Sequence, residues 1–308
     1  MLPGNNLQIF IPCKRIISYL PIYKIIYIIY CATTHYTTQT KRKVKIMLLR
    51  VTQSNYKDFR TACGFEHIFG SRALTAFLAY GENNEVHRFW LSLGEDHIDA
   101  VMHLNGTVLT VIKNRGVDTE EDSIVDDVLE ITRCREVKEI DSDWDLCAVL
   151  HGILGGYTES SYYMTYTGGK ITSSFPDIKS AYLDDVFSVL QQSHEYYRTH
   201  LKFEPWSANL KSCIATGCTE VFQLERDGKP IGTGSIISQD DSHAAIAAVA
   251  VIPEYRLQGI GSYITNFLVK QIQQKGKTPC LISGYDEVAE LYKKIGFETV
   301  GRWGELYL

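Results

Sequence analysis

The order of apolar and polar positions from residue 177 onward predicts alternating helices and strands. Apolar residues at helical spacing predict one long helix from Asp177 to Tyr197. A second helix is expected to begin at Glu204-Pro205, because proline suits a first helical turn, and to end near Gly217. The elements expected after it are strands at Glu220–Arg226, Ile231–Gln239 and Ala244–Ile252, a helix at Gly259–Lys275, a strand at Cys280–Ser283, a helix at Glu287–Ile295 and a strand from Glu298.

The preceding segment, residues 47–169, also alternates short strands with helices. Asn105-Gly106 separates two apolar stretches and favours a two-residue hairpin turn, because both residues accept a positive φ. Ser123 suits the N-cap of a helix, and a further helix is expected from Asp143 to Leu154, ending at Gly155-Gly156. This pattern indicates an α/β or α+β unit.

Glycines and polar residues divide the chain into parts. Gly168-Gly169 and the polar stretch after them form the best boundary between two units. At 308 residues the chain is long enough for about two domains. The predicted division is residues 1–46 as a non-globular extension or a mis-called start, residues 47–169 as a smaller N-terminal α/β domain, and residues 170–308 as a second α/β domain.

The first 46 residues differ in composition from the rest. They hold seven Lys or Arg and no acidic residue, whereas Met47 begins a more ordinary sequence. The unbroken apolar run Ile25–Cys31 is much shorter than the ~20 residues that a spanning helix needs. We therefore do not expect membrane association. A peripheral anchor is the alternative interpretation, because Lys14-Arg15 and the Lys41–Lys45 cluster offer positive charge to anionic lipid.

Charge and cysteine content argue against two classes of function. Residues 47–308 hold 24 basic and 36 acidic residues, which argues against a nucleic-acid partner, since phosphate contacts need clustered Lys and Arg. The eight cysteines show no C-x-x-C pair and no zinc-finger spacing. We expect reduced thiols in a cytoplasmic protein, with no bound metal. The histidines of the first half that show no ligand or triad spacing are interpreted as structural or merely exposed: His87, His97, His103 and His151.

One segment carries recognisable chemistry. An apolar strand runs into Arg256-x-x-Gly259-x-Gly261 and then into an amphipathic helix. Glycines at the start of a helix let a ligand approach the backbone, and the unpaired N–H groups of the first turn bind pyrophosphate with the helix dipole behind them. The hexapeptide alone is a weak signal, because chance gives about one match in every dozen chains of this size. A second signature follows it from Glu290 to Phe297, where Gly296 suits the end of a helix.

Together these two segments resemble the GNAT superfamily of N-acetyltransferases, and the resemblance covers about Phe175 to Leu308. It implies an α/β (α+β) fold with a mixed central sheet flanked by helices, and acetyl-CoA as co-substrate. In the family, the strand before the loop splays from its parallel neighbour so that pantetheine lies in the gap. The hairpin and helix of residues 47–169 echo this order, so the first half is interpreted as a degenerate GNAT-like repeat without a phosphate loop.

The resemblance also implies roles for individual residues. Tyr292 would protonate the departing coenzyme A thiolate, and a core tyrosine packed at the helix end is the alternative. Many family members have Asn seven residues earlier, where Tyr285 stands here. The residues expected to bind the cofactor, through the strand backbone, the loop or a charge-assisted contact, are Val249, Ala250, Val251, Arg256, Leu257, Gln258, Gly259, Ile260, Gly261 and Ser262.

The predicted function is transfer of an acetyl group from acetyl-CoA to an amine of a small molecule or a protein. The alternative is a non-catalytic acyl-CoA-binding regulatory module. His243 and Glu254 are candidate bases, with a solvated surface role as the competing interpretation for each. Trp206, Tyr196 and Tyr197 are candidates for the wall of the acceptor site, with core packing as the competing interpretation.

Overall fold

A computed structural model of the chain describes residues 48–117, 121–169 and 175–308. These described residues form one compact unit. The predictions for residues 1–46 lie outside the described residues. Helices and strands of the first half are β1 (Leu48–Arg50), η1 (Gln53–Asn55), α2 (Tyr56–Ala62), η2 (Cys63–Phe65), α3 (His67–Tyr80), β2 (His87–Leu93), β3 (Ile98–Asn105), β4 (Val108–Lys113), α4 (Glu121–Cys134), β5 (Glu139–Asp143), α5 (Trp144–Leu154) and β6 (Tyr157–Tyr166).

The second half repeats the order of the first. In each half a short strand is followed by a group of helices, three antiparallel strands, and then helix, strand, helix and strand. The elements of the second half are β7 (Ile178–Ser180), α6 (Leu183–Ser193), α7 (Glu195–His200), α8 (Phe203–Ala215), β8 (Glu220–Arg226), β9 (Lys229–Gln239), β10 (His243–Val251), η3 (Pro253–Tyr255), α9 (Ile260–Gln274), β11 (Thr278–Ser283), α10 (Asp286–Ile295) and β12 (Phe297–Tyr307).

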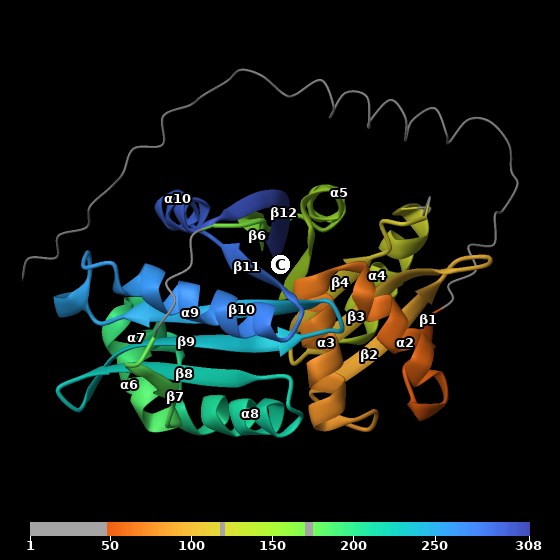
Figure 1. Cartoon of the computed structure of the whole chain (residues 1–308). Coiled ribbons are helices and arrows are strands. Elements are labelled where there is room, and N and C mark those ends of the chain that lie inside the picture. The colour runs from red at the N-terminus through yellow and green to blue at the C-terminus, as the bar shows by residue number, and fades with distance from the viewer. Residues whose placement is uncertain (1–47, 118–120, 170–174) are drawn as a thin grey trace, which may run out of the picture. The chain divides into compact units, whose positions relative to one another are not determined.

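All the described strands join one mixed sheet (Figure 1). Their order is β1-β2-β3-β4-β5-β12-β6-β11-β10-β9-β8-β7. The strands β1 to β6 correspond in order to β7 to β12. When each strand label is exchanged for that of its counterpart, the resulting order is the original order in reverse. The two halves are therefore related by a two-fold topological symmetry, which identifies the first half as a second copy of the fold of the second half.

The last strand of each half is exchanged at the centre of the sheet. β12 lies between β5 and β6, where Trp303 pairs with Asp143 and with Ser161. β6 in turn pairs with β11 of the second half, with Cys280 opposite Thr165. Each half completes its part of the sheet with a strand from the other, so the two halves share one continuous sheet. The predicted domain boundary at residue 170 stays a prediction.

A buried carboxyl group lies at this exchange. Asp141 on β5 pairs with Glu305 on β12, and its side chain is buried. Its Oδ1 atom has no hydrogen-bond partner among the described residues. Burial, with the nearby charge of Glu139, raises the pKa of Asp141 to about 8. Such a group favours its protonated form in the folded state.

The sequence predicted most elements of the second half, but the helix expected from Asp177 to Tyr197 is wrong. Ile178 to Ser180 form β7, because they find an antiparallel partner in β8. The helical part then breaks at His194, whose backbone is extended at φ −152°. The His194 side chain accepts a hydrogen bond from the Tyr196 amide and so caps α7. Neither the remote strand partner nor this cap is visible in apolar periodicity.

Helices cover both faces of the sheet and also connect the halves. α9 packs through Ile264 in the same cluster as Leu224 of β8, whereas α6 packs through Val189 in a separate cluster with Val221 of that strand. α3 belongs to the first half, yet it packs against β9 and β10 of the second (Figure 1). The Phe69 ring on α3 stacks on the Trp303 ring of β12, with 3.7 Å between centroids. The two halves thus share a hydrophobic core.

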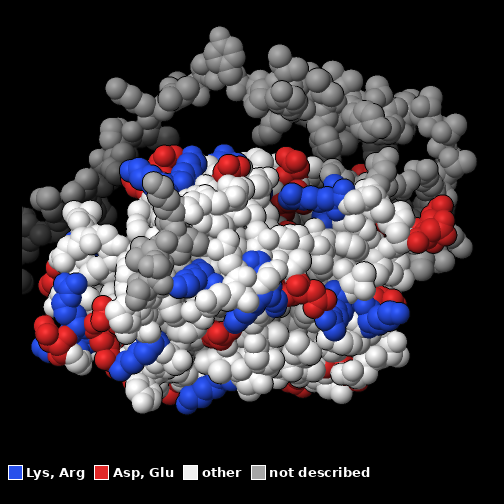
Figure 2. All heavy atoms as spheres, viewed as in Figure 1, with Lys and Arg blue, Asp and Glu red and all other residues white. Residues whose placement is uncertain are grey.

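On the face shown in Figure 2, Lys and Arg side chains are interspersed with Asp and Glu side chains. Because the two kinds of charge are interspersed, no single basic stripe is visible on that face. Among helices of the described ranges, none combines the length and the apolar character needed to cross a membrane. The six cysteines for which the structure gives a state are free thiols: Cys63, Cys134, Cys147, Cys213, Cys218 and Cys280.

Candidate functional site

The glycine loop lies where β10 passes through η3 into α9. Gly259 is the N-cap of α9 and has a left-handed φ of 78°, and Leu257 has a φ of 59°. Two left-handed residues within three positions turn the chain sharply before the helix begins. The Leu257 side chain is fully exposed, so the turn is not held by a buried side chain at this position.

The first turn of α9 presents backbone N–H groups. Tyr263 donates the first intrahelical hydrogen bond, to the Gly259 carbonyl at 3.0 Å. The amides of Ile260, Gly261 and Ser262 precede it and have no carbonyl partner within the helix. Within the described ranges, no side chain caps this end. The positive dipole end of a fifteen-residue helix is thus open to an anion.

Glycine is present at positions 259 and 261 for different physical reasons. The left-handed φ accounts for glycine at position 259. Gly261 has no positive φ, and a Cβ placed on it would meet no heavy atom of the described residues within 4 Å. Glycine inside a helix costs roughly 0.5–1 kcal/mol relative to alanine. Since neither packing nor backbone conformation requires Gly261, the open space in front of its backbone is the remaining reason for it.

A cavity borders the same turn. Its volume is about 370 Å³. The residues that line it come from the start of α9 with its loop and from the β8–β9 hairpin and its neighbourhood: Gln258, Gly259, Ile260 and Tyr263, and Asp177, Leu224, Glu225, Arg226 and Ile231. The first turn of α9 therefore stands beside a hollow rather than beneath packed side chains.

Next to the loop, β10 parts from its parallel neighbour. β10 and β11 pair from His243 opposite Thr278 as far as Ile246 opposite Leu281, and neither strand has a partner in the other beyond that point. A β-bulge between Ala247 and Ala250 shifts the register with β9. Within the bulge Ala248 has a left-handed φ of 52°. On the β11 side Val249 to Val251 therefore have no strand partner, whereas Ala250 and Val251 still pair with β9 on the other side.

Arg256 holds the loop in place through hydrogen bonds to two backbone carbonyls. Its Nε donates to the Val251 carbonyl at 3.1 Å, and its guanidinium also donates to the Ser193 carbonyl at the end of α6. These bonds tie the end of β10 to the helix that covers it. Arg256 thus holds the loop through backbone carbonyls, and the amides of the α9 first turn remain as the groups that face outward.

Tyr292 lies on α10 with its hydroxyl group unengaged. Its ring packs edge-on against Phe297, with 5.7 Å between centroids, and is partly buried. Gly296 ends the helix with a left-handed φ of 119°, as predicted. Among the residues that the structure describes, no hydrogen-bond partner is found for the Tyr292 hydroxyl. Burial, with Tyr197 nearby, raises the pKa of Tyr292 to about 12, so the phenol is neutral at physiological pH.

Comparison with known proteins gives a family for this region. Residues 179–297 match the sequence model described as the acetyltransferase (GNAT) family. This part of the chain is a GNAT domain. No curated protein sequence matches the chain at a significant level.

Solved structures extend the likeness of the fold to most of the chain. A tandem GNAT protein from the clavulanic acid biosynthesis pathway is 8% identical, with a TM-score of 0.58 over 85% of this chain and 97% of that one. A GNAT-family acetyltransferase from Colwellia psychrerythraea is 13% identical, with a TM-score of 0.55 over 85% and 99%. This chain covers 64% of a putative GNAT acetyltransferase from Novosphingobium aromaticivorans, at 14% identity and a TM-score of 0.40 over 49% of this chain. The first two likenesses show a tandem GNAT fold.

The first half keeps the GNAT topology but not the glycine loop. Its parallel strands β4 and β5 pair from Val108 to Thr110 and then part, as β10 and β11 do. The helix that follows them, α4, carries the exposed Asp122 in its first turn. Acidic residues at a helix N-terminus repel phosphate, so this position is unsuited to pyrophosphate. The absence of a phosphate loop in the first half stays a prediction from the sequence.

The candidate bases of the GNAT domain lie differently from one another. Glu254 is in η3 and exposed, one turn before the loop. His243 begins β10, at the paired end of the strand and away from the gap, where its ring stacks on His67. The structure therefore does not bring His243 to the site. Tyr285, which stands at the position of the family's asparagine, is the N-cap of α10 and is exposed.

Two features of the site escaped sequence analysis. The bulge at Ala248 is an unremarked alanine within an apolar strand, and the contact from Arg256 to Ser193 joins residues 63 positions apart. Of the proposed acceptor-site aromatics, Trp206 packs against Phe187 and Tyr197 lies in the α6 cluster beside Ala248. Tyr196 is exposed. Tyr197 and Trp206 both pack in the cluster that includes Ala248 and Ala250 of β10, and Tyr197 also lies close enough to Tyr292 to help raise its pKa.

Proposed function

We propose that the second half transfers an acetyl group from acetyl-CoA to an amine of a small molecule or a protein. The observation that carries the proposal is an uncapped helix N-terminus with open space in front of Gly261, beside the point where β10 and β11 stop pairing. Family membership supports acyl transfer in general. The identity of the acyl donor and of the acceptor is part of the proposal.

The residues present fit a coenzyme A thioester. Backbone amides from Leu257 to Ser262 would receive the pyrophosphate at the start of α9, where a negative charge is favoured. Val249, Ala250 and Val251 would offer backbone groups to pantetheine in the gap beside β10. Arg256 contributes by holding the end of β10 and the loop in register, since its guanidinium contacts backbone carbonyls.

The chemistry needs a neutral amine, a polarised thioester carbonyl and a proton for the leaving thiolate. The amine nitrogen attacks the carbonyl carbon, the C–S bond breaks, the nitrogen loses one proton to water, and the thiolate takes up a proton. The Tyr292 hydroxyl is the donor in this proposal, because it is protonated at neutral pH and unengaged by the described part of the chain. A pKa of about 12 makes it a weak acid. Its help is therefore greatest as a hydrogen-bond donor to developing negative charge, with proton transfer completed as the thiolate departs.

A second candidate function is a non-catalytic acyl-CoA-binding regulatory module. The observation in its favour is Tyr285, an exposed tyrosine where many GNAT proteins carry a cofactor-contacting asparagine. The two functions share the cofactor site and differ only in turnover. We also propose a cytoplasmic location, which the free thiols of the described residues support.

One pair of measurements separates these functions. Isothermal titration of the full chain with acetyl-CoA tests the loop, and thiol release against a panel of small amines and peptide amines tests turnover. Binding together with amine-dependent thiol release supports the enzyme. Binding without release from any amine supports the regulatory module. Absence of binding contradicts both.

A further inference from the structure

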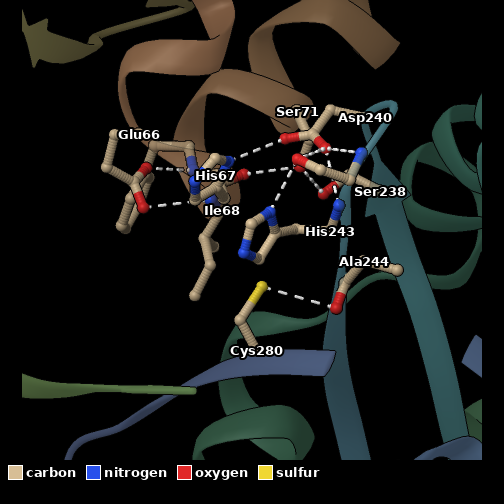
Figure 3. A network of polar contacts seen from close by, with 11 residues as sticks. Glu66, His67, Ile68, Ser71, Ser238, Asp240, His243, Ala244 and Cys280 are labelled. Carbon is tan, nitrogen blue, oxygen red and sulfur yellow. Dashed lines mark hydrogen bonds and ion pairs between the residues drawn. The ribbon is translucent and has the colours of Figure 1, made fainter. Parts of the chain in front are cut away.

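A His–Asp–His cluster lies where the two halves meet, away from the glycine loop. His67 is the first residue of α3, whereas Asp240 and His243 lie in and just after the β9–β10 turn. Figure 3 shows the three side chains converging from these two elements. Each can offer one ligand atom, and the three atoms lie within 4.8 Å of one another.

We propose that His67, Asp240 and His243 bind one divalent transition-metal ion, with zinc as the best match. Two imidazoles and one carboxylate are a ligand set typical of zinc and of its neighbours in the first transition row. His67 Nδ1 and Asp240 Oδ2 are 3.1 Å apart. Ligand atoms around a tetrahedral ion with bonds of ~2.0–2.2 Å are roughly 3.3–3.5 Å apart. The ion would therefore take the place of the proton that these two atoms share.

The turn that carries Asp240 orients it for this role. Asp240 Oδ1 accepts hydrogen bonds from the amides of Ser242 and His243, each at 2.7 Å. With Oδ1 occupied, Oδ2 is the oxygen left to face His67. Ligands that are fixed by hydrogen bonds of their own are a regular feature of metal sites.

Ser242 orients the second imidazole. Its Oγ lies 3.1 Å from Asp240 Oδ1 and 2.8 Å from His243 Nδ1. An ionised carboxylate only accepts, so the hydroxyl proton goes to Asp240 and the hydroxyl oxygen accepts from His243 Nδ1–H. This tautomer leaves a lone pair on His243 Nε2. In the part of the chain that the structure describes, Nε2 has no other partner.

The rings must rearrange slightly to bind an ion. The imidazoles of His67 and His243 stack with 3.5 Å between centroids and 14° between planes. A metal lies in the plane of each imidazole that binds it, so one ring must turn out of the stack. His67 has room to do so, because its side chain is 34% exposed. The same exposure gives an ion access from solvent and leaves a coordination position for water.

A bound ion would link the two halves. α3 already meets the end of β9 through the buried hydrogen bond between Ser71 and Ser238, at 2.8 Å. An exposed ion pair joins Arg60 of α2 to Asp241 in the β9–β10 turn. An ion held by His67 on one side and by Asp240 and His243 on the other would stabilise the contact without touching the glycine loop.

The test uses the full chain after treatment with a chelator. Zinc is titrated calorimetrically, cobalt(II) binding is followed by its visible absorption, and thermal melts are recorded with and without zinc. We expect one ion per chain, a tetrahedral cobalt spectrum, and a melting temperature about 5 °C higher when zinc is in hundredfold excess over its Kd. His67→Gln, His243→Gln and Asp240→Asn should each weaken binding at least tenfold.

A matched control is available in the first half. His97 Nε2 lies 2.9 Å from Asp99 Oδ1, a His–carboxylate pair outside the ligand group. His97→Gln should leave zinc affinity unchanged. Equal affinity in all four variants would mean adventitious surface binding and would overturn the proposal, as would no binding to the parent chain. Melts show whether a variant is folded, and titration shows whether it binds zinc. A variant that melts at the metal-free temperature of the parent chain but does not bind zinc has lost the site and kept the fold.

Discussion

Replacing Gly261 by aspartate separates ligand binding from folding more cleanly than any other change in the loop. A Cβ at Gly261 meets no heavy atom within 4 Å, and its backbone has no positive φ. A side chain there should therefore leave the fold intact. Aspartate in a first helical turn also interacts favourably with the helix dipole, by roughly 0.3–1 kcal/mol. The free energy of unfolding is expected to stay equal or to rise.

Acetyl-CoA binding should respond in the opposite direction. A carboxylate about 5 Å from a phosphate repels it by roughly 1–3 kcal/mol for effective dielectric constants of about 80 to 20. Since the aspartate side chain would also crowd the pyrophosphate, Gly261→Asp should weaken the binding free energy of acetyl-CoA by at least ~1.4 kcal/mol. The Kd would then rise at least tenfold. Gly259→Asp should weaken binding as well, but it also strains a residue whose φ is 78°, so its effect mixes binding with stability.

Isothermal titration gives the Kd, and chemical denaturation gives the free energy of unfolding. The control is Gly152→Asp on α5, because Gly152 is also a helical glycine with open space around its Cβ. It should leave the Kd unchanged. If Gly261→Asp keeps both the parent stability and the parent Kd, the first turn of α9 is not where the pyrophosphate binds.

Three further changes test other parts of the reasoning. Tyr292→Phe keeps the ring against Phe297 but removes the proton donor, so kcat and kcat/KM for a competent amine should both fall ~10²–10⁴-fold with little change in the Kd for acetyl-CoA. If kcat falls less than about threefold while chemistry is rate-limiting, water is the proton donor. If stability and acetyl-CoA binding are lost together, Tyr292 is a core residue. Asp141→Asn should stabilise the fold at pH 8 by at least ~1 kcal/mol but not near pH 4, because a carboxyl whose folded pKa is raised from 3.8 to about 8 destabilises the protein progressively as the pH rises between those values. Thermal melts of both chains across that pH range should therefore diverge, and melts that stay parallel would contradict a raised pKa for the buried Asp141. Removing residues 1–46 should leave acetyl-CoA affinity unchanged in titrations of the remaining folded chain, and loss of binding there would make this segment part of the site.

Local sequence patterns determined much of the second half. The loop glycines, Gly296 at the end of α10 and the turns between β8, β9 and β10 depend on φ preferences and on neighbours a few positions away. Such interactions are complete within a short segment, so the sequence displays them directly. The glycine loop and Tyr292 were singled out for the same reason, because each stands in a compact motif.

Tertiary structure decided what depends on distant partners. Ile178 to Ser180 became a strand because β8 lies beside them, and the bulge at Ala248 formed where β10 leaves β11. The exchange of β6 and β12 pairs strands from opposite halves, and periodicity along one strand carries no information on which neighbour it will have. The cluster of His67, Asp240 and His243 joins residues 173 positions apart. Only the packing of α3 across the two halves brings them within reach of one ion.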